Sequence, residues 1–411
     1  MSVRPRTYAW YVLALLTAIN FVNYVDRQII VGMYDDFRTR FHMTNGQIGA
    51  LTTAFFTVHA LTTVPFGWAA DRFDRRKIAA LAVIGWSLAT LGSAYAVGFL
   101  SLLLLRGAIG VGEAAYLPVS NTILCEVFPD SKAKSLGIFN GGMFAGACVG
   151  VAVGGLIGFP TAFQIVAVPG LVLGVMVMFL RVPPHRDSKL PTMRLRDSFR
   201  PLDRRTLHWM LAGGILVSFT AGGYISWFAD FIVRDKGMDK NTAVLVLGGI
   251  VLTGGALGAI TGGWVADRLQ RRWRFGRTIT VALGFFLAIP FALLAIFVDR
   301  GWLFFLSAWL LMFFLPWYNG PMAAVIDDVV DDGEASTAQA SFSFVLHLVG
   351  TGPASMIVGY AADGWGSLRL ALLLPTGATL LAGVCCLVAC RHVDADMRRR
   401  AERAAALSAV A

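Results

Sequence analysis

Long runs of apolar residues, separated by short polar segments, dominate the pattern of this 411-residue chain. A helix needs about 20 consecutive apolar residues to cross the hydrocarbon core of a bilayer. Twelve runs approach or exceed this length, which predicts an all-α membrane protein with twelve transmembrane helices. Their approximate spans are 9–33, 46–69, 78–97, 99–127, 135–157, 161–181, 207–233, 241–266, 278–298, 301–326, 337–360 and 368–390.

One polar loop occurs twice in the chain. The stretch Gly67–Arg76, GWAADRFDRR, recurs at Gly263–Arg272 as GWVADRLQRR, and each copy follows the second apolar run of its half. Such a repeat predicts two pseudo-symmetric six-helix bundles related by duplication. We therefore predict an N-terminal bundle over residues 1–181, a linker over 182–205, a C-terminal bundle over 206–390 and a tail over 391–411.

The charge distribution supports a membrane protein and predicts its orientation. Only 15% of the residues are charged, against about a quarter in an ordinary soluble domain. Of the 35 lysines and arginines, 26 fall in the segments on the side of the N-terminus and 7 on the opposite side. The positive-inside rule then places both termini in the cytoplasm. This topology accounts for the net charge of +10 without a nucleic-acid partner.

Asp26, Arg27, Arg106 and Glu113 are charged residues inside predicted helices, where a charge near the bilayer centre costs about 2.5–3.5 kcal/mol. Arg106 and Glu113 are seven residues apart in the fourth helix and share one face. Asp26 and Arg27 in the first helix lie at the predicted depth of Arg106, so Asp26 can pair with Arg106 across the cavity. Burial and a nearby arginine act in opposite directions on the protonation of Glu113, which suits proton coupling. The alternatives are a purely structural ion pair and, for Asp26 and Arg27, an interfacial pair near the outer mouth.

The repeated loop predicts a gate. Asp71 can face the positive N-terminus of a neighbouring helix, and the arginines can anchor to acidic groups or lipid headgroups. Contacts of this kind hold one side closed in one state and break in the other. Anchoring alone would explain the arginines but not an aspartate in both copies. The predicted gate residues are Gly67, Asp71, Arg72, Arg75, Arg76, Asp267, Arg268 and Asp327, the last within an acidic run that is alternatively a solvated loop.

The loop resembles the signature loop between the second and third helices of the major facilitator superfamily, with Asp74 where that signature usually has glycine. Within this superfamily the chain is most similar to the Spinster family of lipid-related transporters. The similarity lies in Asn23–Arg27, Pro65–Phe73, Trp86–Thr90, Arg106–Ala114 and Ser367–Leu372. Proton-coupled organic-anion symporters are similar at two of these stretches. The resemblance implies that Asp26 and Glu113 act in proton coupling and that Arg106 and Arg27 contact substrate.

Polar and aromatic residues on several helices are further candidates for substrate contact. The run Pro316–Pro321 predicts a locally broken tenth helix whose freed carbonyl groups face the substrate. Helix packing is the alternative role for each aromatic residue. Gly146, Gly150 and Gly154 repeat at four-residue spacing in the fifth helix, which predicts close packing between the two halves. The candidate substrate contacts are Asn23, Tyr24, Tyr116, Trp317, Tyr318 and Asn319.

These patterns together predict a secondary active transporter. We expect alternating access driven by the proton gradient, with no other cofactor, in an integral multi-pass protein of the inner membrane if the source is bacterial. We expect a monomer without enzyme activity, a metal site or a phosphate-binding loop for ATP. The Spinster resemblance implies a lysophospholipid- or sphingolipid-like anionic amphiphile as substrate, with membrane lipids as the other partners. Proton symport of a small organic or sugar acid is the alternative, and a passive lipid scramblase is the alternative of a different class.

Overall fold

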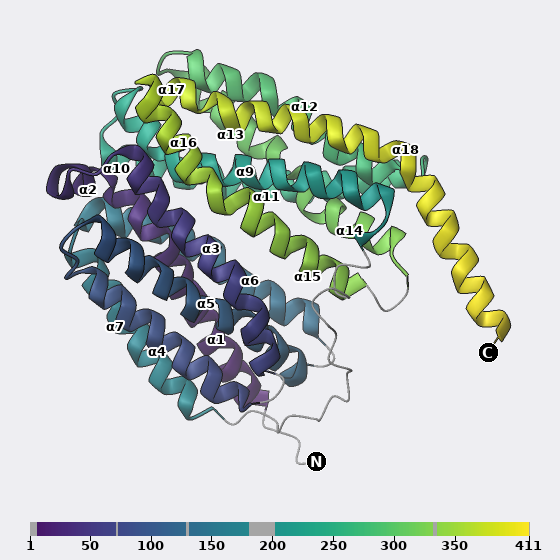
Figure 1. The fold of residues 1–411 in the computed structure, drawn as a ribbon, viewed down its shortest axis with the longest axis horizontal. Coiled ribbons are helices and arrows are strands. Elements are labelled where there is room, and N and C mark those ends of the chain that lie inside the picture. Colours follow the sequence, from purple (N-terminus) through teal and green to yellow (C-terminus); the bar gives the residue numbers. More distant parts are fainter. Residues whose placement is uncertain (1–5, 71–72, 129–130, 181–201, 332–334, 411) are drawn as a thin grey trace. The chain divides into compact units, whose positions relative to one another are not determined.

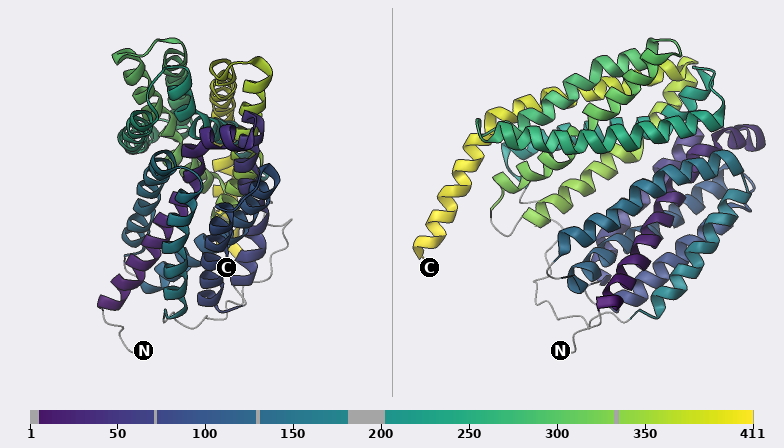
Figure 2. Two further views of the ribbon diagram at one scale, coloured as in Figure 1. Left: turned by 90° about the vertical axis from the view of Figure 1, so that its left-hand side faces the viewer. Right: turned by 180° about the vertical axis from the view of Figure 1, so that it is seen from behind.

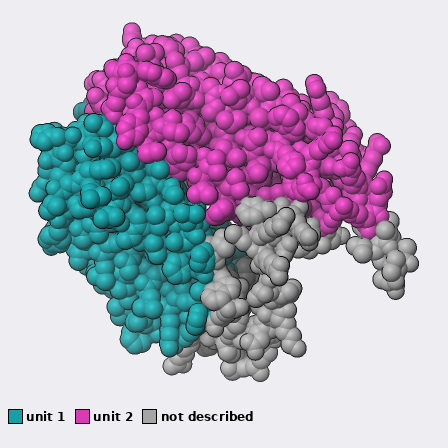
Figure 3. All heavy atoms as spheres, in the orientation of Figure 1, with its two compact units in different colours: residues 1–189, 239–245 teal, residues 190–238, 246–411 magenta. Residues whose placement is uncertain are grey.

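The computed structural model describes residues 6–70, 73–128, 131–180, 202–331 and 335–410. The chain divides into two compact units, each of which is built from long helices. Unit 1 contains residues Met1–Lys189 together with Asp239–Leu245, and unit 2 contains Leu190–Met238 and Val246–Ala411 (Figure 3). The described residues contain helices and turns and no strand.

Unit 1 is a bundle whose long helices run side by side (Figures 1 and 2). Helix α1 ends in the 3₁₀ turn η1, Ile30–Met33, and is followed by the short helix α2. The helices of this unit are α1 (Arg6–Ile29), α2 (Tyr34–Phe41), α3 (Asn45–Ala70), α4 (Arg75–Ser93), α5 (Phe99–Val127), α6 (Lys132–Ile157) and α7 (Thr161–Met178).

Unit 2 contains helices that are interrupted by other helical geometries. The interruptions are the π turn η3 (Val251–Gly255), the 3₁₀ turn η4 (Leu315–Tyr318) and the π turn η5 (Leu346–Thr351). The helices are α9 (Arg205–Arg234), α11 (Ala256–Gln270), α12 (Gly276–Phe297), α13 (Trp302–Phe314), α14 (Asn319–Val329), α15 (Ala335–Val345), α16 (Gly352–Trp365), α17 (Leu368–Ala371) and α18 (Leu373–Val410). Helix α10 (Lys240–Ile250) leads into η3.

Each of the twelve predicted spans falls on a helical stretch of the structure. Ten stretches of the described residues are long and apolar enough to cross a membrane, and α3 and α4 complete the set of twelve. Helices satisfy every backbone hydrogen bond internally, as a segment in hydrocarbon must. The predicted all-α membrane fold is therefore confirmed.

The closest helix contact in unit 1 is between α1 and α6. A Cβ atom at Gly146, Gly150 or Gly154 would lie within 2.5 Å of a carbonyl oxygen of α1, from Phe21, Val25 or Ile29. These three glycines therefore let the two backbones touch, as small residues do between membrane helices. The predicted close packing is present, but its partner is α1 of the same half. The prediction of contact between halves was wrong, because four-residue spacing specifies a packing face without specifying its partner.

Two of the interruptions in unit 2 have a proline as their local cause. Pro316 lies in η4, and Pro353 is the second residue after η5. Proline lacks the amide hydrogen of a regular helix and its ring clashes with the carbonyl four residues earlier. The predicted break in the tenth helix is thus present, between α13 and α14. Gly262 and Gly284 make room for Trp317 of η4, since a Cβ at either would lie 2.6 Å from Trp317 atoms.

Candidate functional site

The candidate site is a cluster of four buried charges held by α1 and α5 of unit 1. Asp26 and Arg27 lie in the last turn of α1 before it tightens into η1, and Arg106 and Glu113 lie on α5. The exposed fractions of these side chains are 2% for Asp26, 8% for Arg27, 1% for Arg106 and 0% for Glu113. Charges buried to this extent are stable only when paired. Both arginines have a carboxylate partner.

Asp26 pairs with Arg106, as the sequence predicted from their matching depths. The Nη1 atom of Arg106 lies 3.6 Å from Oδ1 of Asp26 and donates a hydrogen bond of 3.3 Å to the Asp26 carbonyl oxygen. Thr90 of α4 donates a hydrogen bond from its hydroxyl group to the other carboxylate oxygen. The Asp26 carboxylate therefore has partners on two helices other than its own.

Glu113 pairs with Arg27. Nε of Arg27 lies 2.6 Å from Oε2 of Glu113. The sequence predicted that an arginine would oppose neutralisation of Glu113, and Arg27 of α1 is the one in direct contact. The adjacent residues Asp26 and Arg27 thus each contact a different residue of α5. Arg106 and Glu113 are about 10 Å apart along the axis of α5. The two ion pairs therefore lie at different heights along the contact between α1 and α5.

Aromatic rings cover the two guanidinium groups. The Arg27 guanidinium carbon lies 4.8 Å from the ring centre of Tyr24 and 5.2 Å from that of Phe55. Arg106 lies 5.1 Å from the ring centre of Phe55 on α3. The face of an aromatic ring attracts a cation, most strongly where water is excluded. Phe55 therefore contacts both arginines without neutralising either charge.

Several polar atoms of the cluster retain hydrogen-bonding capacity. Asn23 is buried one turn before Asp26, and neither of its amide atoms has a partner among the described residues. Oε1 of Glu113, Nη2 of Arg27 and Nε of Arg106 also have no hydrogen-bond partner among the described residues, and Oδ1 of Asp26 has only its ion pair with Arg106. A buried polar atom without a partner costs about 1–3 kcal/mol. The cluster therefore favours the binding of a further polar or charged group. No cluster of metal-ligating side chains was found in the described part of the chain.

The remaining predicted substrate contacts fall into two groups. Tyr116 is fully buried in the core of unit 1, where its hydroxyl group donates a 2.6 Å hydrogen bond to the carbonyl oxygen of Leu16; this is the position of a packing residue. Trp317, Tyr318 and Asn319 lie at the break between α13 and α14. Trp317 is buried and Asn319 is exposed. Trp317 and Tyr318 thus lie in the predicted break, and Asn319 begins the helix that follows it.

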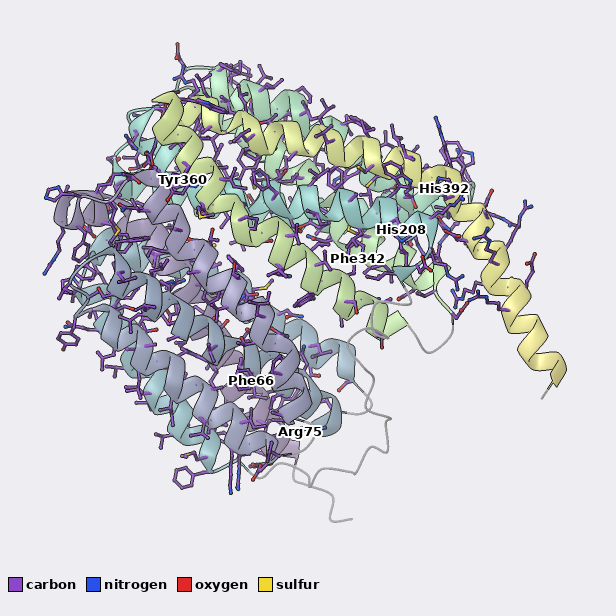
Figure 4. The ribbon with its side chains drawn as sticks, viewed as in Figure 1. Phe66, Arg75, His208, Phe342, Tyr360 and His392 are labelled. Carbon is purple, nitrogen blue, oxygen red and sulfur yellow. The ribbon has the colours of Figure 1, made fainter. Side chains whose placement is uncertain are left out.

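The first copy of the gate loop is described only in part. Asp71 and Arg72 lie outside the described residues, and so do the surroundings of Gly67. Asp74 caps α4, because its side chain accepts a 3.0 Å hydrogen bond from the Arg76 backbone amide. Aspartate is a preferred residue at this position of a helix, which gives a physical reason for its presence where the signature has glycine. Arg75 begins α4 (Figure 4), and Arg76 pairs with Asp74 at 3.2 Å.

The second copy of the loop lies in a charged network of unit 2. Arg277 of α12 lies 3.4 Å from Asp267 and makes two hydrogen bonds of 2.7 and 2.8 Å to Asp328 of α14. Arg268 instead lies over the Trp264 ring, at 5.6 Å. Asp327 accepts a 2.7 Å hydrogen bond from Gln339. The acidic run therefore contributes Asp328, rather than Asp327, as the direct partner of a basic residue beside the repeated loop.

The C-terminal helix α18 contacts residues of the same charged region of unit 2. Arg204 and Arg403 both lie 2.9 Å from Asp331. Asp396 of α18 accepts a 2.9 Å hydrogen bond from the Thr206 amide at the start of α9. Figure 4 shows His208 on α9 and His392 on α18 in this region. The network joins α9, α14 and α18 at one end of the unit.

Sequence reasoning missed three contributors to these networks: Thr90, Phe55 and Arg277. Phe55 is an uncharged member of an apolar run, and Thr90 ends the stretch Trp86–Thr90 that carries the Spinster similarity, where it was given no role of its own. Arg277 was counted among the loop arginines without a role of its own. The position of Arg277 was a usable signal, because it lies at the start of the helix that follows the second loop copy and can therefore reach that loop.

Comparisons with known proteins assign the chain to a class and then to relatives. The sequence model of the Major Facilitator Superfamily matches residues 16–351, so this chain belongs to that superfamily of membrane transporters. It is 26% identical to human Protein spinster homolog 1, over 94% of this chain and 82% of the relative. It is also 26% identical to the sphingosine-1-phosphate transporter SPNS2 of Mus musculus, over 85% of this chain and 69% of that protein.

A solved structure shows the same fold. A bacterial homologue of the human lysosomal transporter Spinster, in an inward-facing and unoccupied conformation, matches with a TM-score of 0.80. The identity is 22%, and the match covers 97% of this chain and 98% of the other. The similarity to the Spinster family that the sequence indicated is thereby confirmed. The protein is an integral, multi-pass membrane transporter and not an enzyme.

Proposed function

We propose that this transporter works by alternating access, is driven by the proton gradient, and carries an anionic amphiphile of the lysophospholipid or sphingolipid class. The observation that carries the proposal is the buried cluster of the ion pairs Asp26–Arg106 and Arg27–Glu113. Each side chain has a partner of opposite charge, yet each keeps a polar atom without a hydrogen-bond partner among the described residues. A structural ion pair alone would not require uncommitted donors on both arginines. The relatives named above support the choice of a lipid-like substrate.

The geometry suggests how proton and substrate binding are linked. Arg27 has one nitrogen on Glu113 and another without a partner among the described residues. A proton on Glu113 would remove the charge that holds Arg27, and the freed guanidinium can then accept an anionic headgroup. Arginine suits this role because its planar group binds phosphate through two parallel hydrogen bonds. Protonation and anion binding thus favour each other, which is the condition for coupled transport.

The test is flux in proteoliposomes with an imposed proton gradient, using a labelled lysophospholipid and a labelled sugar acid in parallel. Glu113→Gln keeps the size of the side chain and removes its charge. We expect gradient-driven uptake to fall at least tenfold while exchange of labelled for unlabelled substrate, without a gradient, continues. Glu402→Gln, the same change at an exposed position of α18, is the matched control and should behave as the wild type.

Each other outcome assigns a different role. If the gradient drives uptake equally in wild type and Glu113→Gln, then Glu113 is structural and the coupling proposal fails. If only the sugar acid is accumulated, the protein is a proton-coupled symporter of small organic acids. If the lysophospholipid crosses without any dependence on the gradient or on Glu113, the protein is a passive scramblase.

A further inference from the structure

The C-terminal helix α18 continues well beyond the last apolar run of the chain. It spans Leu373–Val410 as one helix, whereas the apolar run ends near Cys390 (Figure 1). We name residues 391–403 of this helix the tail segment. Within it Val393 and Asp396 are buried, with exposed fractions of 2% and 1%. A helix that only projected into solvent would bury neither residue, so one face of the tail segment packs on the rest of unit 2.

Asp396 of the tail segment caps a helix that lies elsewhere in the sequence. Its carboxylate accepts a 2.9 Å hydrogen bond from the backbone amide of Thr206, in the first turn of α9. The first amide groups of a helix have no partner within it, and Arg204, the N-cap residue of α9, makes no capping hydrogen bond with its side chain. A carboxylate also suits the positive end of the helix dipole. The tail segment therefore supplies the cap that α9 lacks.

Arg400 and Arg403 bind a helix end of the opposite polarity, the end of α14. Arg400 donates a hydrogen bond to the backbone carbonyl oxygen of Asp327, in the last turn of α14. Carbonyl groups at this end lack partners within their helix, and a cation suits the negative end of the dipole. Arg403 lies 2.9 Å from a carboxylate oxygen of Asp331, and the same oxygen lies 2.9 Å from Arg204. The tail segment thus holds the end of α14 by both main chain and side chain.

The three charged residues of the tail segment act from one face of the helix. At 100° per residue, Asp396, Arg400 and Arg403 fall within about 60° of one another around the axis. The residues Arg391 and Arg398 are exposed. The order of charges on the packed face matches the two helix ends that it contacts, because the carboxylate lies at the start of α9 and the guanidinium groups lie at the end of α14.

The turn of α14 that the tail segment holds also carries the partner of Arg277. Asp328 accepts hydrogen bonds of 2.7 and 2.8 Å from Arg277, which lies 3.4 Å from Asp267 in the repeated loop. Asp328 directly follows Asp327, so the main-chain contact of Arg400 lies next to it in the sequence. An ion pair between a guanidinium group and a carboxylate requires a defined geometry. That geometry depends here on the position of the last turn of α14.

We propose that the tail segment is a positioning element of the transporter, which holds the end of α14 so that Asp328 stays on Arg277 beside the repeated loop. The proposal rests on the alternating-access function proposed above and adds a part to its gate. A purely stabilising role would affect folding alone. A positioning role affects the rate of the transport cycle and not the apparent affinity for substrate, because the buried ion pairs of the candidate site lie in unit 1.

The test removes both tail arginines from the full chain, as the double variant Arg400→Gln with Arg403→Gln. Hydrogen–deuterium exchange read by mass spectrometry should show amide exchange at residues 326–331 rising about tenfold, since local opening of the last turn of α14 becomes easier. Exchange in α5 of unit 1 should not change. In proteoliposomes the maximal rate of gradient-driven uptake should fall about threefold or more, with KM within about twofold of the wild type.

Two further double variants separate position from charge. Arg391→Gln with Arg398→Gln makes the same change of charge at two exposed residues of the tail segment, and it should match the wild type in exchange and in rate. Arg400→Lys with Arg403→Lys keeps both positive charges and should restore most of the rate. If the glutamine double variant does not reach the membrane, Arg403→Gln alone takes its place, because the Arg403 side chain is 61% exposed.

The outcomes distinguish this proposal from the function on which it rests. If exchange at residues 326–331 stays at the wild-type level in the glutamine variant, the tail segment does not hold α14 and the proposal fails. If exchange rises while the rate of uptake is unchanged, the tail segment supports α14 without positioning the gate, and the proposal fails as well. If the wild type shows no gradient-driven uptake, the proton-coupled function fails. The rate at which labelled substrate exchanges for unlabelled substrate then decides on the tail segment by the same criterion.

Discussion

The two halves of this transporter share a repeated loop but differ in how their helices are built. Unit 1 carries four buried charges, two in the last turn of α1 and two within α5, in the pairs Asp26–Arg106 and Arg27–Glu113. Unit 2 carries neutral hydrogen bonds at comparable sites between helices, such as Tyr224 to Thr376 at 2.7 Å. Its helices are interrupted at three places, η3, η4 and η5, against the single turn η1 in the described residues of unit 1. Duplication therefore preserved the loop and allowed the helix interiors to diverge.

This difference indicates that the two halves have different roles in transport. Charges in the membrane are costly and are retained where they respond to protons or substrate. Interrupted helices expose backbone carbonyl groups and adapt their shape at low cost. We therefore expect unit 1 to respond to protons and to the charge of the substrate, and unit 2 to respond to the shape of the substrate.

The largest effect is expected when one partner of a unit 1 ion pair is removed. Arg27→Leu leaves Glu113 buried with its direct partner lost, which should lower the free energy of unfolding by about 3–5 kcal/mol. The double variant Arg27→Leu with Glu113→Leu removes both charges and should recover most of that loss. Unfolding by titration with SDS in mixed micelles measures both. Additive losses in the double variant would show that the pair is not coupled.

An intermediate effect is expected from one substitution made in both halves. Thr90→Val removes the hydrogen bond to the Asp26 carboxylate and should cost about 1.5–3 kcal/mol, as for other bonds to charged groups. Thr220→Val in unit 2 removes bonds to neutral partners, Thr379 and the Pro375 carbonyl group, and should cost about 0.5–1.5 kcal/mol. Equal costs, measured by the same titration, would contradict the contrast between the halves.

The smallest effect is expected at the end of α9, outside the membrane-spanning segments. Burial raises the pKa of the Asp235 carboxyl group above its ordinary value of 3.8, and Arg369, 3.8 Å away, opposes this shift. The folded protein then holds this proton more tightly than the unfolded chain does. Stability should therefore decline as pH rises from about 3.8 through the folded pKa. Asp235→Asn should flatten that part of the pH profile in thermal unfolding, and an unchanged slope would exclude this role for Asp235.

The sequence predicted the fold almost completely and the site in part. Apolar runs and the repeated loop specify twelve helices and two halves, because length and hydropathy decide what crosses a bilayer. The pair Asp26–Arg106 followed from matching depths. The partner of Glu113 did not, because it depends on how α1 is rotated against α5. Hydropathy does not encode that rotation.

Other features depended on contacts that a single chain does not display. The π turn η3 contains no proline and so gives no clear mark in the sequence, whereas Pro353 marks η5. Phe55 contacts both arginines only because α3 packs on α5. The partner of the glycine face on α6 was equally hidden. Tertiary packing, rather than periodicity, decides each of these.

The glycine contact between α1 and α6 has a consequence for how this protein tolerates mutation. At Gly146, Gly150 and Gly154 the neighbouring atoms are backbone carbonyl oxygens, which cannot turn aside as a side chain can. In a saturation-mutagenesis map these positions should reject alanine as firmly as arginine, with a period of four along α6. At this contact the size of the side chain, rather than its chemistry, decides whether a substitution is tolerated. We therefore expect α1, which carries Asp26 and Arg27, to move together with α6.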